Sequence, residues 1–199
     1  TGSSGNKKLS IANWVYDSTA SEYKLIQESP DKTVSTHKNF AENPVYLDSV
    51  YTTPTNQVNT AYLVYNFFAR DKGDESNDYD RHLMNVLNKF SAQGVSNLIL
   101  DLRYNGGGAV SSANALASAL KPNRDVSQLF STAEYNPLVH ASLKKEYGNN
   151  YNKTFFLDKI TSKSGDITIP RMSITKLYVL VSNWSASASE LVINGLKPY

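Results

Sequence analysis

The chain has 199 residues, of which 40% are hydrophobic and 19% charged, and a formal net charge of +2 at pH 7. This composition is that of a globular protein with one main domain, because it supplies enough apolar side chains for a core. The near balance of charge gives no reason to expect nucleic acid as a partner. The absence of cysteine excludes disulfides, thiolate zinc sites and cysteine nucleophiles, so any nucleophile must be an oxygen or an amine.

The N-terminal part is polar and carries only short β-type patches, at 9–16 and 23–26, which predict two strands without a core of their own. Aromatic and β-branched residues at 61–68 predict a strand, and we expect the compact domain to begin near residue 45. No apolar run approaches the roughly 18 to 20 residues that span a bilayer. The chain opens without a signal peptide or an initiator Met, which favours an internal start.

Five acidic residues at 71–80 stand among Gly, Ser and Asn and predict a solvated loop. Such a loop could hold a cation through oxygen ligands, although its spacing matches no calcium-binding loop. After it, apolar residues at helical spacing predict a helix that ends near Gly94; they are Leu83, Val86, Leu87 and Phe90.

The order of elements that follows is typical of an α/β protein with a mostly parallel sheet. The apolar runs 95–103 and 174–182 each predict a strand buried on both faces. Each run is followed by small residues and a predicted helix, over 111–120 and 185–196. The segment 123–170 shows no pattern that assigns its elements.

The carboxyl ends of parallel strands meet at one edge of a sheet, where helix N-termini present unpaired N–H groups. We therefore expect the two strand-to-helix junctions at the same edge. Gly106, Gly107 and Gly108 leave room for a substrate and permit the backbone to aim consecutive N–H groups at an oxyanion or a phosphate. The loop lacks the ending of a P-loop and the third Gly of a dinucleotide fingerprint, and a tight turn explains it equally well.

Ser187 at the second junction has two interpretations. Its spacing to Glu190 is that of a capping box, in which Ser187 is the helix N-cap. A nucleophile at a helix N-terminus would show the same pattern, since Ala186 and Ala188 leave space at the hydroxyl and Ala188 can donate its N–H. The residue types alone favour the cap.

Taken together, the segments 98–108 (LILDLRYNGGG) and 177–190 (LYVLVSNWSASASE) resemble the carboxyl-terminal processing, or tail-specific, proteases of peptidase family S41, especially those of Bacteroides-type bacteria. The resemblance covers roughly 45–199. It implies a ClpP/crotonase-like core and a serine-type peptidase that cuts protein or peptide substrates near their C-termini. It also implies that Ser187 is the nucleophile. The oxyanion hole is implied to consist of a backbone N–H from Gly107 or Gly108 together with that of Ala188.

A serine needs a base to take its proton, and a buried lysine with a lowered pKa can do so. The resemblance implies such a Ser/Lys dyad, so we expect no catalytic histidine, metal ion or cofactor. In the family this lysine follows the nucleophile helix, beyond Tyr199. Lys197 is no substitute, because ten residues of helix place it roughly 15 Å from Ser187, and Pro198 stands where some members carry an acid.

We therefore expect 45–199 to be an incomplete, truncated peptidase core that is inactive as it stands. Residues 1–44 resemble the connector and last strand of a missing PDZ domain, and the family places the protein in the periplasm or cell envelope of a bacterium. Two alternatives stay open. One is a non-catalytic module that binds peptides or apolar ligands on the same fold, and the other is a nucleotide-binding domain that uses the glycine loop.

Overall fold

The computed structural model describes residues 6–9, 12–27, 32–35, 42–53 and 58–199. The chain divides into two compact units, Thr1–Glu42 and Asn43–Tyr199. The described residues of the first unit form four strands, where the sequence predicted two. They pair antiparallel as β1 (Asn6–Leu9) with β4 (Lys32–Ser35), and β2 (Ala12–Asp17) with β3 (Glu22–Gln27).

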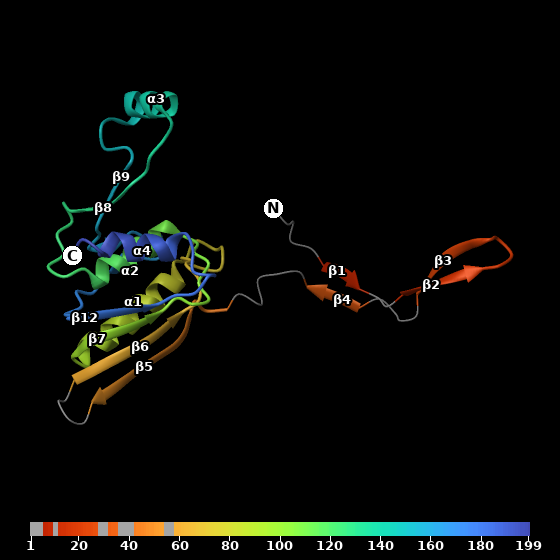
Figure 1. The fold of residues 1–199 in the computed structure, drawn as a ribbon, viewed down its shortest axis with the longest axis horizontal. Coiled ribbons are helices and arrows are strands. Elements are labelled where there is room, and N and C mark those ends of the chain that lie inside the picture. Colours follow the sequence, from red (N-terminus) through yellow and green to blue (C-terminus); the bar gives the residue numbers. More distant parts are fainter. Residues whose placement is uncertain (1–5, 10–11, 28–31, 36–41, 54–57) are drawn as a thin grey trace. The chain divides into compact units, whose positions relative to one another are not determined.

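The second unit is built on a four-stranded sheet in the order β12-β7-β6-β5 (Figure 1). Its strands are β5 (Val45–Thr53), β6 (Val58–Tyr65), β7 (Val95–Asp101) and β12 (Lys176–Leu180). β12, β7 and β6 run parallel, and β5 pairs antiparallel with β6. The α/β class is confirmed, and the sheet is mixed with a parallel majority.

Three helices lie along one face of this sheet, as Figure 1 shows. They are α1 (Asp78–Ala92), α2 (Val110–Leu120) and α4 (Ala188–Leu196), each within a few residues of its predicted position. Leu63 and Leu100 of the sheet and Leu87 of α1 are fully buried in the shared core. None of the helices among the described residues is long and apolar enough to cross a bilayer.

Two predictions about burial were wrong. Strands β7 and β12 are not buried on both faces: Leu98 and Leu100 of β7 are buried, but Ile99 between them is half-buried, and Tyr178 of β12 is 51% exposed. An apolar run does not reveal how many faces of a strand are covered. The acidic segment is also not solvated throughout, since Asp80 lies in α1 and is fully buried.

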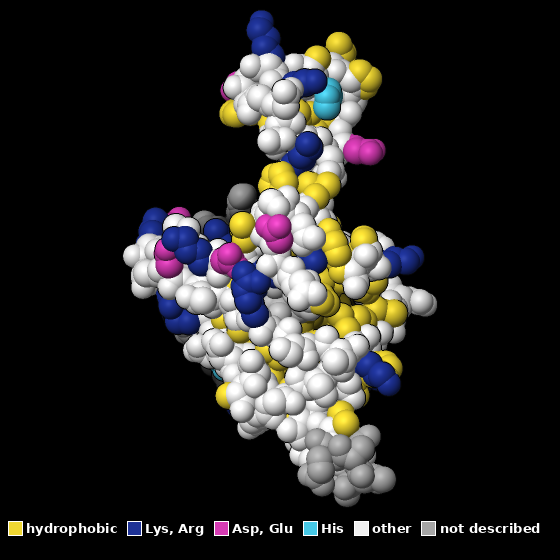
Figure 2. Space-filling view, turned by 90° about the vertical axis from the view of Figure 1, so that its left-hand side faces the viewer, with side chains coloured by type: hydrophobic (Ala, Val, Ile, Leu, Met, Phe, Trp, Pro, Cys, Tyr) yellow, Lys and Arg dark blue, Asp and Glu magenta, His cyan; other side chains and the backbone are white. Residues whose placement is uncertain are grey.

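The middle of the segment that the sequence left unassigned forms a projecting arm, while Ile167 and Ile169 near its end are buried in the core. Its two-stranded ribbon, β8 (Leu129–Thr132) with β9 (Lys153–Phe155), carries helix α3 (Pro137–Tyr147), and a small pair, β10 (Lys159–Ile160) with β11 (Ile167–Thr168), follows. Phe130 and Phe156 at the base of the ribbon pack on Ala117 of α2. Helix α3 has no buried residue, and it stands away from the core with hydrophobic side chains on its lobe (Figures 1 and 2).

Candidate active site

The two strand-to-helix junctions leave the sheet at the same edge, as the sequence predicted, because β7 and β12 are parallel neighbours. Hydrogen bonds continue between them beyond the strands. The Leu102 N–H donates to Leu180 O at 2.9 Å, and the Ser185 hydroxyl donates to Leu102 O at 2.7 Å. The Ser182 hydroxyl donates to Arg103 O. The loops after β7 and β12 therefore form one interlocked unit.

The two loops meet most closely at Gly107 and Ser187. Gly107 has a φ of +106°, and a Cβ atom added to it would lie 2.7 Å from Ser187 Cβ and 2.9 Å from Ala186 O. No other residue fits there without displacing the Ser187 backbone, and the positive φ disfavours a side chain as well. The glycine loop and Ser187 thus converge on one point.

Ser187 occupies a strained position at the start of α4. Its φ and ψ are 55° and −113°, its side chain is exposed, and its N–H donates to Glu190 Oε2 at 2.9 Å. A positive φ in a residue other than glycine costs on the order of 1–3 kcal/mol, and such residues cluster at active sites. Ser187 is the N-cap of α4 and forms a capping box with Glu190, and the residue is also exposed to a substrate.

Two backbone N–H groups near Ser187 lack a hydrogen-bond partner among the described residues: those of Gly108 and Ala188. Ala188 is the first residue of α4, so its N–H has no acceptor within the helix. The Ala188 nitrogen lies 3.0 Å from the position that a Cβ on Gly107 would take. An oxygen atom bound beside Ser187 could accept a hydrogen bond from this helix terminus.

The orientation of the glycine loop is fixed by Phe68. The Phe68 N–H donates to Gly107 O at 2.9 Å, and the Ala109 N–H donates to Phe68 O at 2.8 Å. Across a trans peptide the C=O of Gly107 and the N–H of Gly108 point in opposite directions, so the Gly108 N–H points away from Phe68. The N–H of Gly107 itself is engaged, since it donates to Asn105 Oδ1 at 2.9 Å.

Asn105 is fully buried between the two junctions, although no role was predicted for it. Asp101 at the end of β7 also had no predicted role; its side chain is 1% exposed and pairs with Arg103 at 2.7 Å. Hydrogen bonds from Arg103 and then from Tyr62 lower the pKa of Asp101 to about 2. A polar residue placed directly before a glycine loop was the signal that could have identified Asn105.

Among the described lysines, Lys121 has the lowered pKa expected of a base, and burial is the cause. However, Lys121 caps the far end of α2, about 16 Å along an 11-residue helix that begins beside the glycine loop. Its Nζ lies 3.7 Å from the centre of the Tyr199 ring. Lys197 is the C-cap of α4, at the end opposite Ser187. Neither lysine is placed to deprotonate Ser187.

The histidines offer no alternative base. His82 and His140 are exposed, on α1 and on the projecting α3, and His140 Nδ1 lies 2.7 Å from the Tyr151 hydroxyl. His37 lies outside the described residues. No cluster of three or more His, Asp or Glu side chains that could ligate a metal occurs in the described part of the chain.

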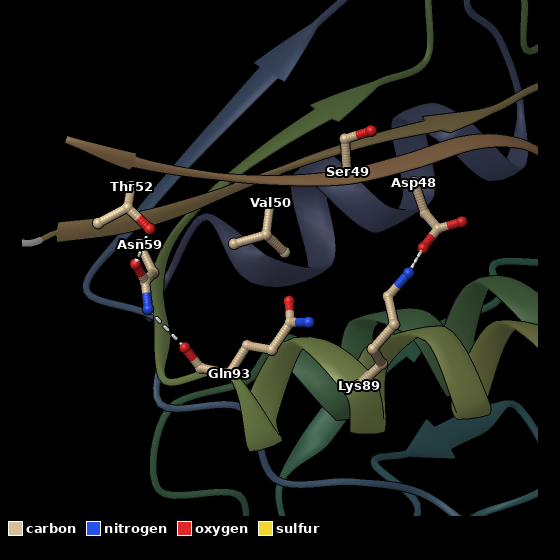
Figure 3. A pocket seen from close by; sticks show the side chains of 7 residues that line it. All are labelled: Asp48, Ser49, Val50, Thr52, Asn59, Lys89 and Gln93. Atoms are coloured by element: carbon tan, nitrogen blue, oxygen red, sulfur yellow. Dashed lines mark hydrogen bonds and ion pairs between the residues drawn. The ribbon is translucent and has the colours of Figure 1, made fainter.

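A cavity of about 490 Å³ lies elsewhere, between β5, β6 and α1 (Figure 3). Its polar groups bond one another: Lys89 pairs with Asp48, and the Asn59 amide donates to Gln93 O at 2.6 Å. Asn59 and Gln93 stand at the amino ends of β6 and β7, opposite the edge that carries Ser187. This cavity is therefore separate from the candidate site.

Two solved structures share this fold. A candidate S41 protease from Bacteroides fragilis NCTC 9343 is 23% identical, with a TM-score of 0.61, and the match covers 98% of this chain and 46% of that one. The photosystem II D1 C-terminal processing protease is 21% identical, with a TM-score of 0.51, and the match covers 91% of this chain and 38% of that one. The chain thus spans less than half the length of either protein.

No curated protein matches the sequence. The sequence model of peptidase family S41, in contrast, matches residues 59–199, which include both junctions and all of the four-stranded sheet except β5 and the first residue of β6. This match covers well over half of the chain. The chain therefore belongs to peptidase family S41.

Proposed function

We propose that the protein is a serine endopeptidase of the C-terminal processing type, on a ClpP/crotonase-like core, with Ser187 as its nucleophile. One observation carries the proposal: the exposed Ser187 adjoins Gly107 at a helix N-terminus, beside two N–H groups without partners in the described chain. Membership of family S41 supports a serine-type peptidase with protein substrates.

The proposed chemistry uses the hydroxyl and the two N–H groups together. The Ser187 oxygen attacks the carbonyl carbon of a peptide bond while a base takes the hydroxyl proton. The oxyanion that forms accepts hydrogen bonds from the N–H groups of Gly108 and Ala188, and one such donor contributes about 10²- to 10³-fold in rate. When the intermediate collapses, the C–N bond breaks and the leaving amine takes the proton from the base, which leaves an acyl-enzyme ester. Water then hydrolyses this ester and releases the Ser187 hydroxyl.

The base is proposed to be a lysine that is not among the 199 residues, forming a Ser/Lys dyad. The positions of Lys121 and Lys197 support this, because both lie at helix ends remote from Ser187. A lysine acts as a base near neutral pH only when burial or a nearby cation lowers its pKa. The 199-residue chain alone is accordingly expected to show no turnover.

The test uses the full-length gene product and a disordered protein substrate such as casein. Ser187→Ala is expected to lower kcat by at least about 10³-fold. Ser111→Ala, an exposed serine in the first turn of α2, is the matched control and should keep the wild-type rate. Turnover retained in Ser187→Ala would contradict the proposal, and wild-type protein that binds peptides without cleaving them would support a binding module.

A further inference from the structure

We infer that Asn105 is a positioning residue that fixes the glycine loop, residues 106–108, against the turn at Ser187 that precedes α4. This inference rests on the proposed peptidase function and concerns the same site. Asn105 is 0% exposed and lies between the end of β7 and the first glycine. It touches no substrate atom in the proposed reaction, so it acts through the backbone of its neighbours.

Every polar group of Asn105 is hydrogen-bonded. Its side-chain Nδ2 donates to Tyr65 O at 2.8 Å, and its Oδ1 accepts from the Gly107 N–H at 2.9 Å. Its backbone O accepts from the Ser189 hydroxyl at 2.8 Å and from the Ala186 N–H at 3.3 Å. Its own N–H donates to Leu102 O at 3.0 Å.

These bonds link three separate parts of the site. Tyr65 is the last residue of β6, so the bond from Nδ2 anchors the loop to the sheet. The bond from Gly107 sets the loop directly before Gly108, which supplies a proposed oxyanion donor. The bonds to the backbone O come from the residues on either side of Ser187 and Ala188. One buried residue thereby holds the hydroxyl and both N–H donors in a common frame.

The neutral amide satisfies both side-chain partners at once, since it donates at one atom and accepts at the other. An ionised carboxylate would face the Tyr65 carbonyl without a proton to donate. Burial raises the pKa of such a carboxyl group, and its protonated form can again donate to Tyr65 and accept from Gly107. An aspartate at position 105 should therefore reproduce the asparagine bonds only at low pH.

The experiment measures kcat and KM of the full-length protein with a chromogenic peptide from pH 5 to 9. We expect Asn105→Asp to lower kcat about 100-fold at pH 8, because a displacement of about 1 Å can cost that much, with KM changed less than about 3-fold. The kcat ratio of variant to wild type should rise at least about 10-fold as pH falls. Asn105→Ala should be slow at every pH.

Asn114→Asp is the matched control. Asn114 is also buried, its Nδ2 donates to Phe155 O at 2.9 Å, and its Oδ1 accepts from the Ser118 hydroxyl at 3.1 Å. It lies on the face of α2 that holds the projecting arm. Its substitution should lower the thermal unfolding temperature but leave a kcat ratio to wild type that does not vary with pH.

The inference would be overturned if Asn105→Asp and Asn105→Ala kept the wild-type kcat at pH 8. A kcat ratio of Asn105→Asp to wild type that does not change with pH would overturn it as well. Ser187→Ala would stay inactive in both cases, so the proposed function would stand. Turnover in Ser187→Ala, or none in the wild type, would overturn the proposed function and this inference with it. If both Asn105 variants fail to fold, the Ser189→Ala variant tests the inference in their place. This variant removes one bond to Asn105 O, so a kcat lowered about 5-fold supports the inference and an unchanged kcat overturns it.

Discussion

The edge of the sheet that carries Ser187 and the projecting arm differ in how their residues are held. At the edge, buried Asn105 and the side chains of Ser185 and Ser189 bond between the two loops, and Asp101 bonds to Arg103 and to Tyr62 of β6. On the arm, α3 has no buried residue and rests on a short ribbon. Several hydrogen bonds between distant residues hold the edge in place, whereas the arm is held by the local structure of α3 and its ribbon.

This difference separates the part of the chain suited to chemistry from the part free to vary. A nucleophile and its oxyanion donors must keep fixed positions, which requires buried polar bonds and close backbone contact. An isolated helix of about 11 residues is marginal in water, so α3 contributes little to the stability of the core. Substitutions at the edge and on the arm should therefore differ strongly in effect.

The largest effect is expected from Gly107→Ala, whose Cβ would meet Ser187 Cβ at 2.7 Å in a backbone with φ +106°. We expect a loss of roughly 2–5 kcal/mol in the free energy of unfolding, from strain and overpacking, together with loss of turnover. Gly106→Ala is the control, since its nearest atom is Trp184 O at 3.8 Å. Urea denaturation that ranks the two variants equally would contradict the close contact.

A smaller effect is expected from Asp101→Asn, which weakens the pairing with Arg103 and Tyr62. The variant should lose about 2 kcal/mol at pH 7, the usual contribution of hydrogen bonds to a charged group. Because folding lowers the pKa of Asp101 from 3.8 to about 2, this stabilisation exists above pH 4 and is lost as pH falls toward 2. Urea titrations should show a smaller difference in the free energy of unfolding between wild type and variant at pH 3 than at pH 7.

In the first turn of α1, Asp80→Asn should increase stability. The Asp80 oxygens are buried and make no well-aligned hydrogen bond among the described residues. Burial raises the pKa of this carboxyl, against the opposing effect of the nearby Ser112 and Asn77 side chains. A raised pKa means that stability is lost as pH rises through the folded-state value, so the neutral amide removes a cost of about 1 kcal/mol at pH 8. Thermal unfolding should show the gain at pH 8 but not near pH 3; a loss at pH 8 would contradict this account of Asp80.

The smallest effect is expected on the arm. Leu138 is 84% exposed on α3, and Leu138→Ser should change the free energy of unfolding by less than about 0.5 kcal/mol. Phe156→Ala, at the buried base of the ribbon, should cost about 3–5 kcal/mol. Similar losses in the two variants, measured by thermal unfolding, would show that the arm is packed against another surface in solution.

The sequence predicted those parts of the fold whose pattern is local. The spacing of Leu83, Leu87 and Phe90 identified α1, and the two strand-to-helix junctions were found because apolar runs end in small residues. The parallel order of strands then placed Ser187 and Gly107 at the same edge, since this follows from topology alone.

The remainder depends on contacts between distant residues, which a sequence pattern does not contain. Helix α3 has no buried residue and only a weak apolar pattern, and β10 and β11 have two residues each. Asn105 looked like an ordinary turn residue because Tyr65, which accepts its hydrogen bond, lies 40 positions away. The half-exposed face of β7 was not predicted, because an apolar composition does not show whether one or both faces of a strand are covered by other elements.

The most direct test of the central claim is covalent labelling of the full-length protein with a fluorophosphonate, followed by mass spectrometry of its peptides. Labelling requires a hydroxyl that is activated as a nucleophile and an oxyanion site beside it. The account predicts one adduct, on Ser187, absent in Ser187→Ala and strongly slowed in Asn105→Ala. An adduct on a different residue, or labelling that Ser187→Ala leaves unchanged, would contradict it.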